Sequence, residues 1–168
     1  MSDSVADSVV IVAAKRTPIG SMNGQLLPLS SPQLASVAIK AAVEQSGLKV
    51  EDITEALIGC VCGSGMKTVM LAYDSILAGS ANVMVAGGME SMSNAPYLLP
   101  KARQGFRYGH VKALDHMAFD GLENAYDGKS MGIFADATAA KYGFTRADQD
   151  AFAAESVKRA QAAVASGA

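Results

Sequence analysis

The sequence contains no tryptophan, and only two cysteines and two histidines occur among its 168 residues. Two cysteines do not make a disulfide framework, so we expect a reducing compartment, with the cytoplasm as the default. The histidines, His110 and His116, lie in a loop-like stretch with no cysteine at ligand spacing. We therefore expect no metal site, and we interpret both histidines as surface or locally hydrogen-bonded residues.

Charge and long apolar runs are also scarce. The net charge is −2, which provides no basic surface for nucleic acid or for an anionic membrane. No apolar run approaches the roughly 20 residues of a membrane-spanning helix, and residues 1–8 are polar and acidic, unlike an export signal. We therefore expect no nucleic-acid partner and no membrane. The hydrophobic fraction of 50% still excludes disorder and allows one ordinary core.

Strand and helix patterns alternate in the first half of the chain. Apolar runs predict buried strands at 9–14, 56–61 and 83–86. A helix capped by Ser31, with Pro32 at its first position, separates the first two strands. This alternation indicates an α/β fold with a mostly parallel sheet, in which active sites lie at the carboxyl ends of the strands.

The second half of the chain has a different texture. Prolines and glycines cluster from about residue 91, so we divide the chain into a core piece, residues 1–95, and an appended subdomain, residues 96–168. Segment 106–109, with the sequence Phe-Arg-Tyr-Gly, is expected to form a small hairpin or arm.

Two further helices are predicted in the subdomain. One covers 131–142, and the other begins at Thr145, where Asp148 completes a weak capping box. Three glycines are placed to end predicted helices in the left-handed conformation: Gly47, Gly79 and Gly143.

The most informative segment reads Cys-Gly-Ser-Gly-Met at 62–66. It is followed by apolar residues at the spacing of one helix face, namely Met66, Val69, Met70, Tyr73, Ile76 and Leu77. Cys62 is therefore predicted at a helix start, where unpaired N–H groups and the helix dipole favour a nucleophilic thiolate. The alternative is a small buried hydrophobic cysteine followed by an ordinary turn.

Several segments together resemble the thiolase family, specifically its acetyl-CoA acetyltransferase branch. These segments are 9–20, 62–67, 82–96, 120–122, 130–132 and 148–152. The resemblance covers nearly the whole chain but only the N-terminal half of a thiolase, because a complete thiolase is more than twice as long. It implies an incomplete thiolase-like layered α/β core together with part of the family's loop subdomain.

The sequence departs from the family pattern in two ways. The predicted strand 56–61 leads directly into Cys62, whereas in thiolases a helix and another strand intervene, so we infer an internal deletion. Cys60-Val-Cys62 is then a junction rather than a redox or metal motif. The motifs of the family's second half, which supply a histidine, a second cysteine and an asparagine, do not occur.

The resemblance implies acyl transfer between an acyl-CoA and acetyl-CoA, giving a 3-ketoacyl-CoA and CoA, or the reverse thiolysis. Cys62 matches the family's catalytic nucleophile, which carries an acyl-cysteine intermediate. Leu122, Ser130 and Met131 match substrate-binding positions, although Ser130 replaces a frequent histidine and Met131 is equally well explained as a helix-packing residue. Coenzyme A would be a substrate, no cofactor would be bound permanently, and the complete enzyme would be a homodimer or homotetramer.

Other interpretations stay open on the sequence. Because the motifs of the family's second half do not occur, we expect the 168-residue chain alone to be without turnover, loosely packed and with exposed apolar surface. The alternative is a non-catalytic truncated remnant of a thiolase that at most associates with a partner. A small thiol redox module built on Cys60 and Cys62 is a weaker alternative. Glu90, an isolated carboxylate beside a tight turn, is expected to have a structural hydrogen-bonding role.

Overall fold

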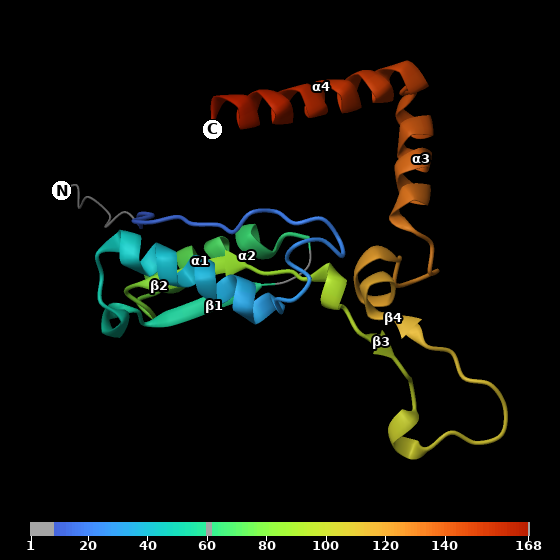
Figure 1. Ribbon diagram of the computed structural model, residues 1–168, viewed down its shortest axis with the longest axis horizontal. Helices are drawn as coiled ribbons and strands as arrows, with labels where there is room; N and C mark the ends of the chain where they lie inside the picture. Colours follow the sequence, from blue (N-terminus) through green and yellow to red (C-terminus); the bar gives the residue numbers. More distant parts are fainter. Residues whose placement is uncertain (1–8, 60–61, 168) are drawn as a thin grey trace, which may run out of the picture. The chain divides into compact units, whose positions relative to one another are not determined.

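The computed structural model describes residues 9–59 and 62–167 of the chain (Figure 1). It divides into two compact units, Met1–Met117 and Ala118–Ala168, which are described separately. The division into domains at about residue 95 stays a prediction.

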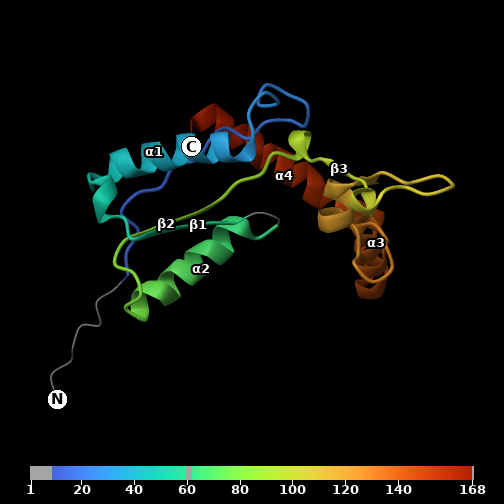
Figure 2. The ribbon, with the colours of Figure 1, turned by 90° about the horizontal axis from the view of Figure 1, so that it is seen from below.

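The centre of the first unit is a pair of parallel strands. Strand β1, Glu55–Gly59, pairs with β2, Met84–Gly88. The register places Glu55 beside Met84 and Gly59 beside Gly88. Helix α2, Ser64–Leu77, connects them and packs against both strands, while α1, Ser31–Ser46, lies on the other side of the pair (Figure 2). The predicted α/β architecture with a parallel sheet and helices is confirmed.

The predicted strand at 9–14 is wrong. Residues 9–20 form no strand, and the side chains of Val10, Ile11 and Val12 are 67%, 78% and 60% exposed. A strand is completed by hydrogen bonds from a neighbouring strand, and an apolar β-branched run supplies none of these by itself. The two other predicted strands are present with shifted bounds, although residues 60 and 61 lie outside the described residues.

Helix α1 begins one residue earlier than its predicted cap implies. Ser30, and not Ser31, is the N-cap, with an extended backbone at φ −71° and ψ 159°. The Oε1 atom of Gln33 accepts hydrogen bonds from the Ser30 N–H at 2.8 Å and from its hydroxyl at 2.9 Å. Gln33 stands three residues after Ser30, so the capping box selects the first of two adjacent serines.

A short antiparallel pair forms the base of an arm in the first unit. Strand β3, Tyr97–Leu98, pairs with β4, Leu114–Asp115. The predicted hairpin segment 106–109 lies in the connection between these strands and is not itself a strand. The remaining short elements of this unit are the 3₁₀ turns Val50–Asp52, Met92–Asn94 and Ala102–Gln104.

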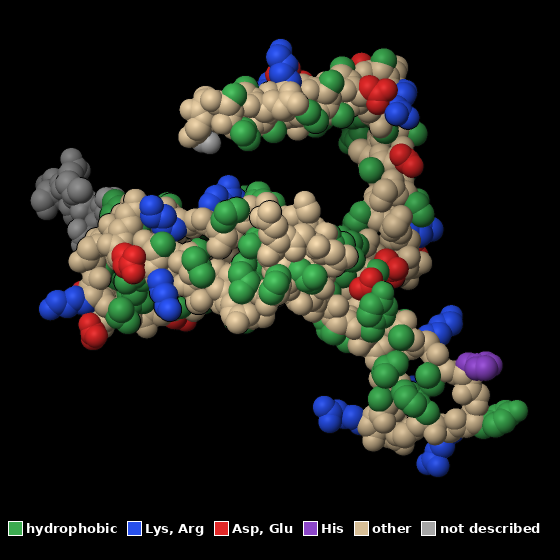
Figure 3. Space-filling model, viewed as in Figure 1, with side chains coloured by type: hydrophobic (Ala, Val, Ile, Leu, Met, Phe, Trp, Pro, Cys, Tyr) green, Lys and Arg blue, Asp and Glu red, His purple; other side chains and the backbone are tan. Residues whose placement is uncertain are grey.

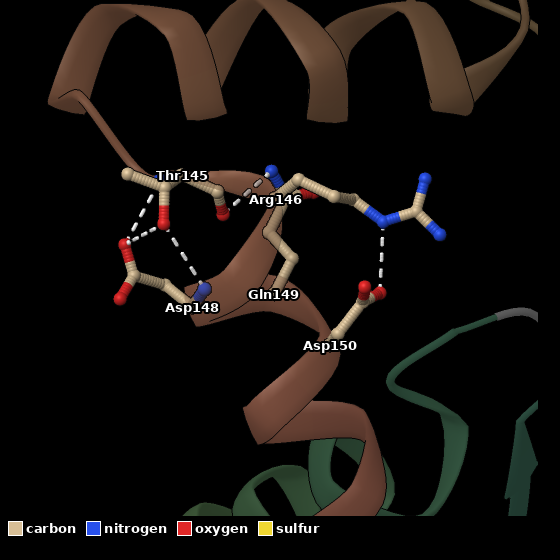
Figure 4. Close-up of polar contacts among 5 residues, drawn as sticks. All are labelled: Thr145, Arg146, Asp148, Gln149 and Asp150. Atoms are coloured by element: carbon tan, nitrogen blue, oxygen red, sulfur yellow. Dashed lines mark hydrogen bonds and ion pairs between the residues drawn. The ribbon is translucent and has the colours of Figure 1, made fainter.

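The second unit contains η4, a π-helical turn at Ala118–Leu122, and the helices α3, Met131–Tyr142, and α4, Arg146–Ser166. Both predicted helices are confirmed. The Thr145 hydroxyl accepts from the Asp148 N–H at 3.1 Å, and the Asp148 carboxylate accepts from the Thr145 N–H at 2.9 Å (Figure 4). The predicted helix stops have positive φ: Gly47 +71°, Gly79 +73° and Gly143 +71°.

Burial is shallow throughout the described residues. Only four of them are buried, namely Ala72, Ala81, Ser64 and Thr68, and all four have small side chains. Hydrophobic side chains are spread over the surface that Figure 3 shows, and no large side chain in the described ranges is fully enclosed. The exposed apolar surface expected from the sequence is therefore present.

Candidate active site

The candidate nucleophile lies where the first strand gives way to a helix. Cys62 immediately precedes Gly63, the N-cap of α2, and the first hydrogen bond of that helix joins the Lys67 N–H to the Gly63 carbonyl at 2.8 Å. β1 and β2 run parallel, so their carboxyl ends meet at one edge of the sheet, and α2 begins there. The sequence predicted this position for Cys62.

Glycines at the strand ends allow the first turn of α2 to approach the backbone closely. A Cβ atom on Gly88 would lie 2.8 Å from the Ser64 Cβ and 3.0 Å from the Gly65 nitrogen. A Cβ atom on Gly59 would lie 3.0 Å from the Ser64 carbonyl oxygen. Any larger residue at either strand end would displace this turn, and with it the segment that carries Cys62.

Hydrogen bonds join the same turn to the end of β2. The Ser64 hydroxyl donates to Oε1 of Glu90 at 2.8 Å, and the Thr68 hydroxyl lies 3.0 Å from the carbonyl oxygen of Gly87. Ser64 is 9% exposed and Thr68 is 6% exposed, so their hydroxyls are two of the few polar groups that packing covers. Glu90 has the hydrogen-bonding role expected from the sequence, whereas the contributions of Ser64 and Thr68 were missed.

Cys62 is a free cysteine and is exposed to solvent. This overturns the alternative of a buried hydrophobic cysteine. An open hollow of about 530 Å³ lies beside it, lined by Leu57, Gly59, Ser64, Lys67 and Leu71 among others. A thiol at the rim of a hollow and at a helix N-terminus is accessible to an electrophile that enters from solvent.

The three predicted substrate-binding residues lie in the second unit. An isolated antiparallel bridge between Glu123 and Ser130 closes a loop, so Leu122 and Met131 each adjoin a bridge residue. Ser130 is the N-cap of α3, and the side chains of Leu122 and Met131 are 42% and 47% exposed. The structure therefore brings these three residues together within the second unit, whereas Cys62 belongs to the first unit.

An ion pair stabilises this loop. The Lys129 ammonium lies 2.9 Å from the Asp127 carboxylate. The side-chain hydrogen bond from Lys129, followed by the bond from its backbone N–H, lowers the pKa of Asp127 below its ordinary value. The ion pair therefore favours the charged form of Asp127 in the loop that precedes Ser130.

No helix in the described ranges is long and apolar enough to cross a membrane. The same residues contain no group of three or more histidine, cysteine, aspartate or glutamate side chains arranged to hold a metal ion.

Comparison with known proteins gives consistent matches along the chain. A sequence profile of the family described as Thiolase, N-terminal domain, matches residues 9–62 and 56–168. Acetyl-CoA acetyltransferase of Chromobacterium violaceum is 42% identical over 190 residues, which cover 95% of this chain and 48% of that protein. The corresponding protein of Schizosaccharomyces pombe is 41% identical, covering 96% of this chain and 49% of its own length. The mitochondrial acetyl-CoA acetyltransferase A of Xenopus laevis is 40% identical, covering 99% and 46%.

The pattern of these matches bears on the inferred internal deletion. The chain spans about half the length of the curated relatives it matches. The two profile matches share residues 56–62, a segment that includes most of β1 and ends at Cys62. The first alignment runs over 190 positions although it includes only 95% of a 168-residue chain, so the relative has residues that this chain lacks. The shared segment lies where the internal deletion was inferred from the sequence, and the nature of the missing residues stays a prediction.

Proposed function

The chain belongs to the thiolase family, and from that premise we propose that it provides the acyl-accepting half of a thiolase-type acyltransferase, with Cys62 as the nucleophile. The observation that carries the proposal is the position of the Cys62 thiol. It is exposed, it immediately precedes the N-cap of α2, and it stands at the carboxyl edge of the parallel strands. Activated cysteine nucleophiles are found in such positions.

The proposed first step transfers an acyl group from an acyl-CoA to the cysteine. The Cys62 thiolate attacks the thioester carbonyl carbon, a new carbon–sulfur bond forms, and the bond to the CoA sulfur breaks. CoA leaves as a thiolate and takes a proton from solvent. Backbone N–H groups in the first turn of α2 lie beside the reacting cysteine, and such groups stabilise the oxyanion that develops on the carbonyl.

The second step would condense the acyl-cysteine with acetyl-CoA or return it to CoA. This step needs a base near the substrate methyl group, and in the family that base comes from the other half of the protein. The whole protein would therefore convert an acyl-CoA and acetyl-CoA to a 3-ketoacyl-CoA and CoA. The names of the relatives, acetyl-CoA acetyltransferase, support acetyl-CoA as the acyl donor.

The remaining elements of the proposal concern substrate contacts and setting. Leu122, Ser130 and Met131, which the second unit brings together, would contact the acyl-CoA. A homodimer or homotetramer is proposed for the complete enzyme from the family resemblance. The scarcity of cysteine favours a reducing compartment such as the cytoplasm, while the name of the Xenopus laevis relative places that protein in mitochondria.

The amount of CoA released in the first turnover tests the proposal. The purified chain mixed with acetyl-CoA is expected to release CoA in a burst that matches the protein concentration, because each Cys62 accepts one acetyl group. Cys62→Ala should abolish the burst, and Cys60→Ser, which leaves the candidate nucleophile in place, should retain it. A burst of equal size in Cys62→Ala would contradict the assignment.

The second candidate function is a non-catalytic chain that associates with a partner. The observation in its favour is the shallow burial of the described residues, among which no large side chain is enclosed. It predicts no CoA release from the parent chain, so the same assay separates the two candidates.

A further inference from the structure

We propose that Glu90 is a positioning residue for Cys62 and acts through Ser64. The inference rests on the proposed role of Cys62 as a nucleophile. Nothing in the family profile or in the names of the relatives assigns a role to this carboxylate.

The link between the two residues is a single side-chain hydrogen bond. The Ser64 hydroxyl donates to Oε1 of Glu90 at 2.8 Å. Ser64 is the first residue of α2, whereas Glu90 lies two residues beyond Gly88, the last residue of β2. The bond therefore fastens the first turn of α2 to the end of a strand that is 26 residues away along the chain.

The bond bears on Cys62 because it holds the first turn of α2, which begins two residues after Cys62. Only Gly63 separates Cys62 from Ser64, and glycine restricts the backbone least of all residues. Helix ends fray readily. The hydroxyl of Thr68 also lies near β2, but it is one turn further along α2 and contacts Gly87. Glu90 thus keeps the helix start ordered next to the residue that carries the thiol.

The hydrogen bond and the negative charge of Glu90 have opposite effects on a Cys62 thiolate. A carboxylate accepting from a hydroxyl makes a strong, short hydrogen bond, and a negative group near a helix N-terminus is favourable. The same negative charge disfavours a thiolate nearby. The useful contribution of Glu90 to Cys62 is therefore the hydrogen bond, and a glutamine, which keeps an oxygen acceptor without the charge, should provide it.

Alkylation of Cys62 by iodoacetamide at neutral pH measures this contribution, in a Cys60→Ser background so that one thiol reacts. Glu90→Ala and Glu90→Gln carry the same charge and differ in the hydrogen-bond acceptor. We expect the rate constant of Glu90→Ala to be about two- to fivefold below that of Glu90→Gln, the range set by helix N-terminal stabilisation of an exposed charge. Cys62 is already exposed, so a looser turn cannot raise the rate by improving access.

Two controls separate positioning from general loosening. Adding Ser64→Ala to Glu90→Ala should change the rate little, whereas adding it to Glu90→Gln should lower the rate to that of Glu90→Ala, since each change removes the bond between residues 64 and 90 at constant charge. Thr68→Val, which cuts a different bond between α2 and β2, should alkylate within twofold of the parent. Equal rates in Glu90→Ala and Glu90→Gln, or equal slowing in Thr68→Val, would overturn the inference.

Acetylation by acetyl-CoA is measured in parallel on the same variants. A parent that is alkylated at Cys62 but not acetylated would remove the proposed function. The ratio of the Glu90→Ala and Glu90→Gln alkylation rates would still decide the role of Glu90.

Discussion

Small side chains determine how closely α2 approaches the two parallel strands. Gly59 and Gly88 end β1 and β2, and Ser64 lies against both of them. The contact places the start of the helix, and therefore Cys62, at the carboxyl edge of the sheet. Steric fit at these three positions is a property of single residues that can be tested separately from catalysis.

Gly88→Ala is expected to lower the free energy of unfolding by about 1–3 kcal/mol, the usual cost of an overpacked contact. The added Cβ would lie 3.0 Å from the Gly65 backbone nitrogen, and backbone yields less readily than a flexible side chain. Urea unfolding measures the change. Gly65→Ala is the matched control, because its Cβ would meet only the Gly88 nitrogen at 3.9 Å. Equal stability of the two variants would show that Gly88 is not a close contact.

The sequence predicted the position of Cys62 because the signal is local. A cysteine, two glycines and a helical apolar pattern lie within one short segment. The hydrogen bond from Ser64 to Glu90 joins residues 26 positions apart, so no local sequence pattern predicts that these two residues pair. Leu122, Ser130 and Met131 were found through family resemblance, and their roles stay predictions.

Among the secondary-structure elements, helix α4 has the most completely capped N-terminus. Thr145 and Asp148 satisfy each other's N–H groups, and Arg146 pairs with Asp150 one turn later at 2.8 Å (Figure 4). Thr145→Ala is expected to cost about 1 kcal/mol of stability, the typical value for loss of an N-cap. Thermal melting followed by circular dichroism measures it.

Ser130→Ala is the control for this cap. Ser130 is the N-cap of α3 but has no side-chain cap hydrogen bond, so its replacement should cost less than that of Thr145. A larger loss from Ser130→Ala than from Thr145→Ala would mean that the capping bonds do not stabilise the helix.

The Asp148 carboxylate makes the α4 cap sensitive to acid. The side-chain hydrogen bond from Thr145, followed by the bond from its backbone N–H, lowers the pKa of Asp148 in the folded chain. Its contribution to stability is therefore present above the unfolded pKa and is lost as the pH falls through the folded pKa. Helicity in the parent should decline below about pH 4. In Asp148→Asn this part of the pH dependence should disappear, and an unchanged acid titration of the helix signal would contradict the assignment.

Helices were predicted more reliably than strands, for a physical reason. The starts and ends of α3 and α4 depend on residues close in sequence, such as Thr145 with Asp148 and the left-handed Gly143. A strand depends on a distant partner. The β-branched run at 9–14 has high strand propensity but no paired neighbour, whereas the shorter segments 55–59 and 84–88 pair with each other.

At the scale of the whole molecule, the main feature is apolar surface that the fold leaves exposed. On α2, Met66, Met70 and Leu77 are 74%, 59% and 56% exposed, and residues 10–12 are similarly open. Apolar side chains left exposed in this number favour association between chains. We therefore expect the purified chain to bind a dye that reports apolar surface and to self-associate in size-exclusion chromatography.

Replacing Met66 and Met70 together with glutamine tests that expectation. Dye binding should fall, while the free energy of unfolding should change by no more than about 0.5 kcal/mol, because both side chains are largely exposed. A large loss of stability would show instead that these methionines are part of a packed core.

The central claim is that Cys62 accepts an acyl group, and peptide mapping by mass spectrometry tests it most directly. The chain is incubated with acetyl-CoA, digested, and searched for peptides that carry one acetyl group. The account predicts acetylation of the Cys62 sulfur, removable by hydroxylamine as a thioester is. Acetyl groups found only on lysines or on Cys60, with Cys62 unmodified, would contradict it.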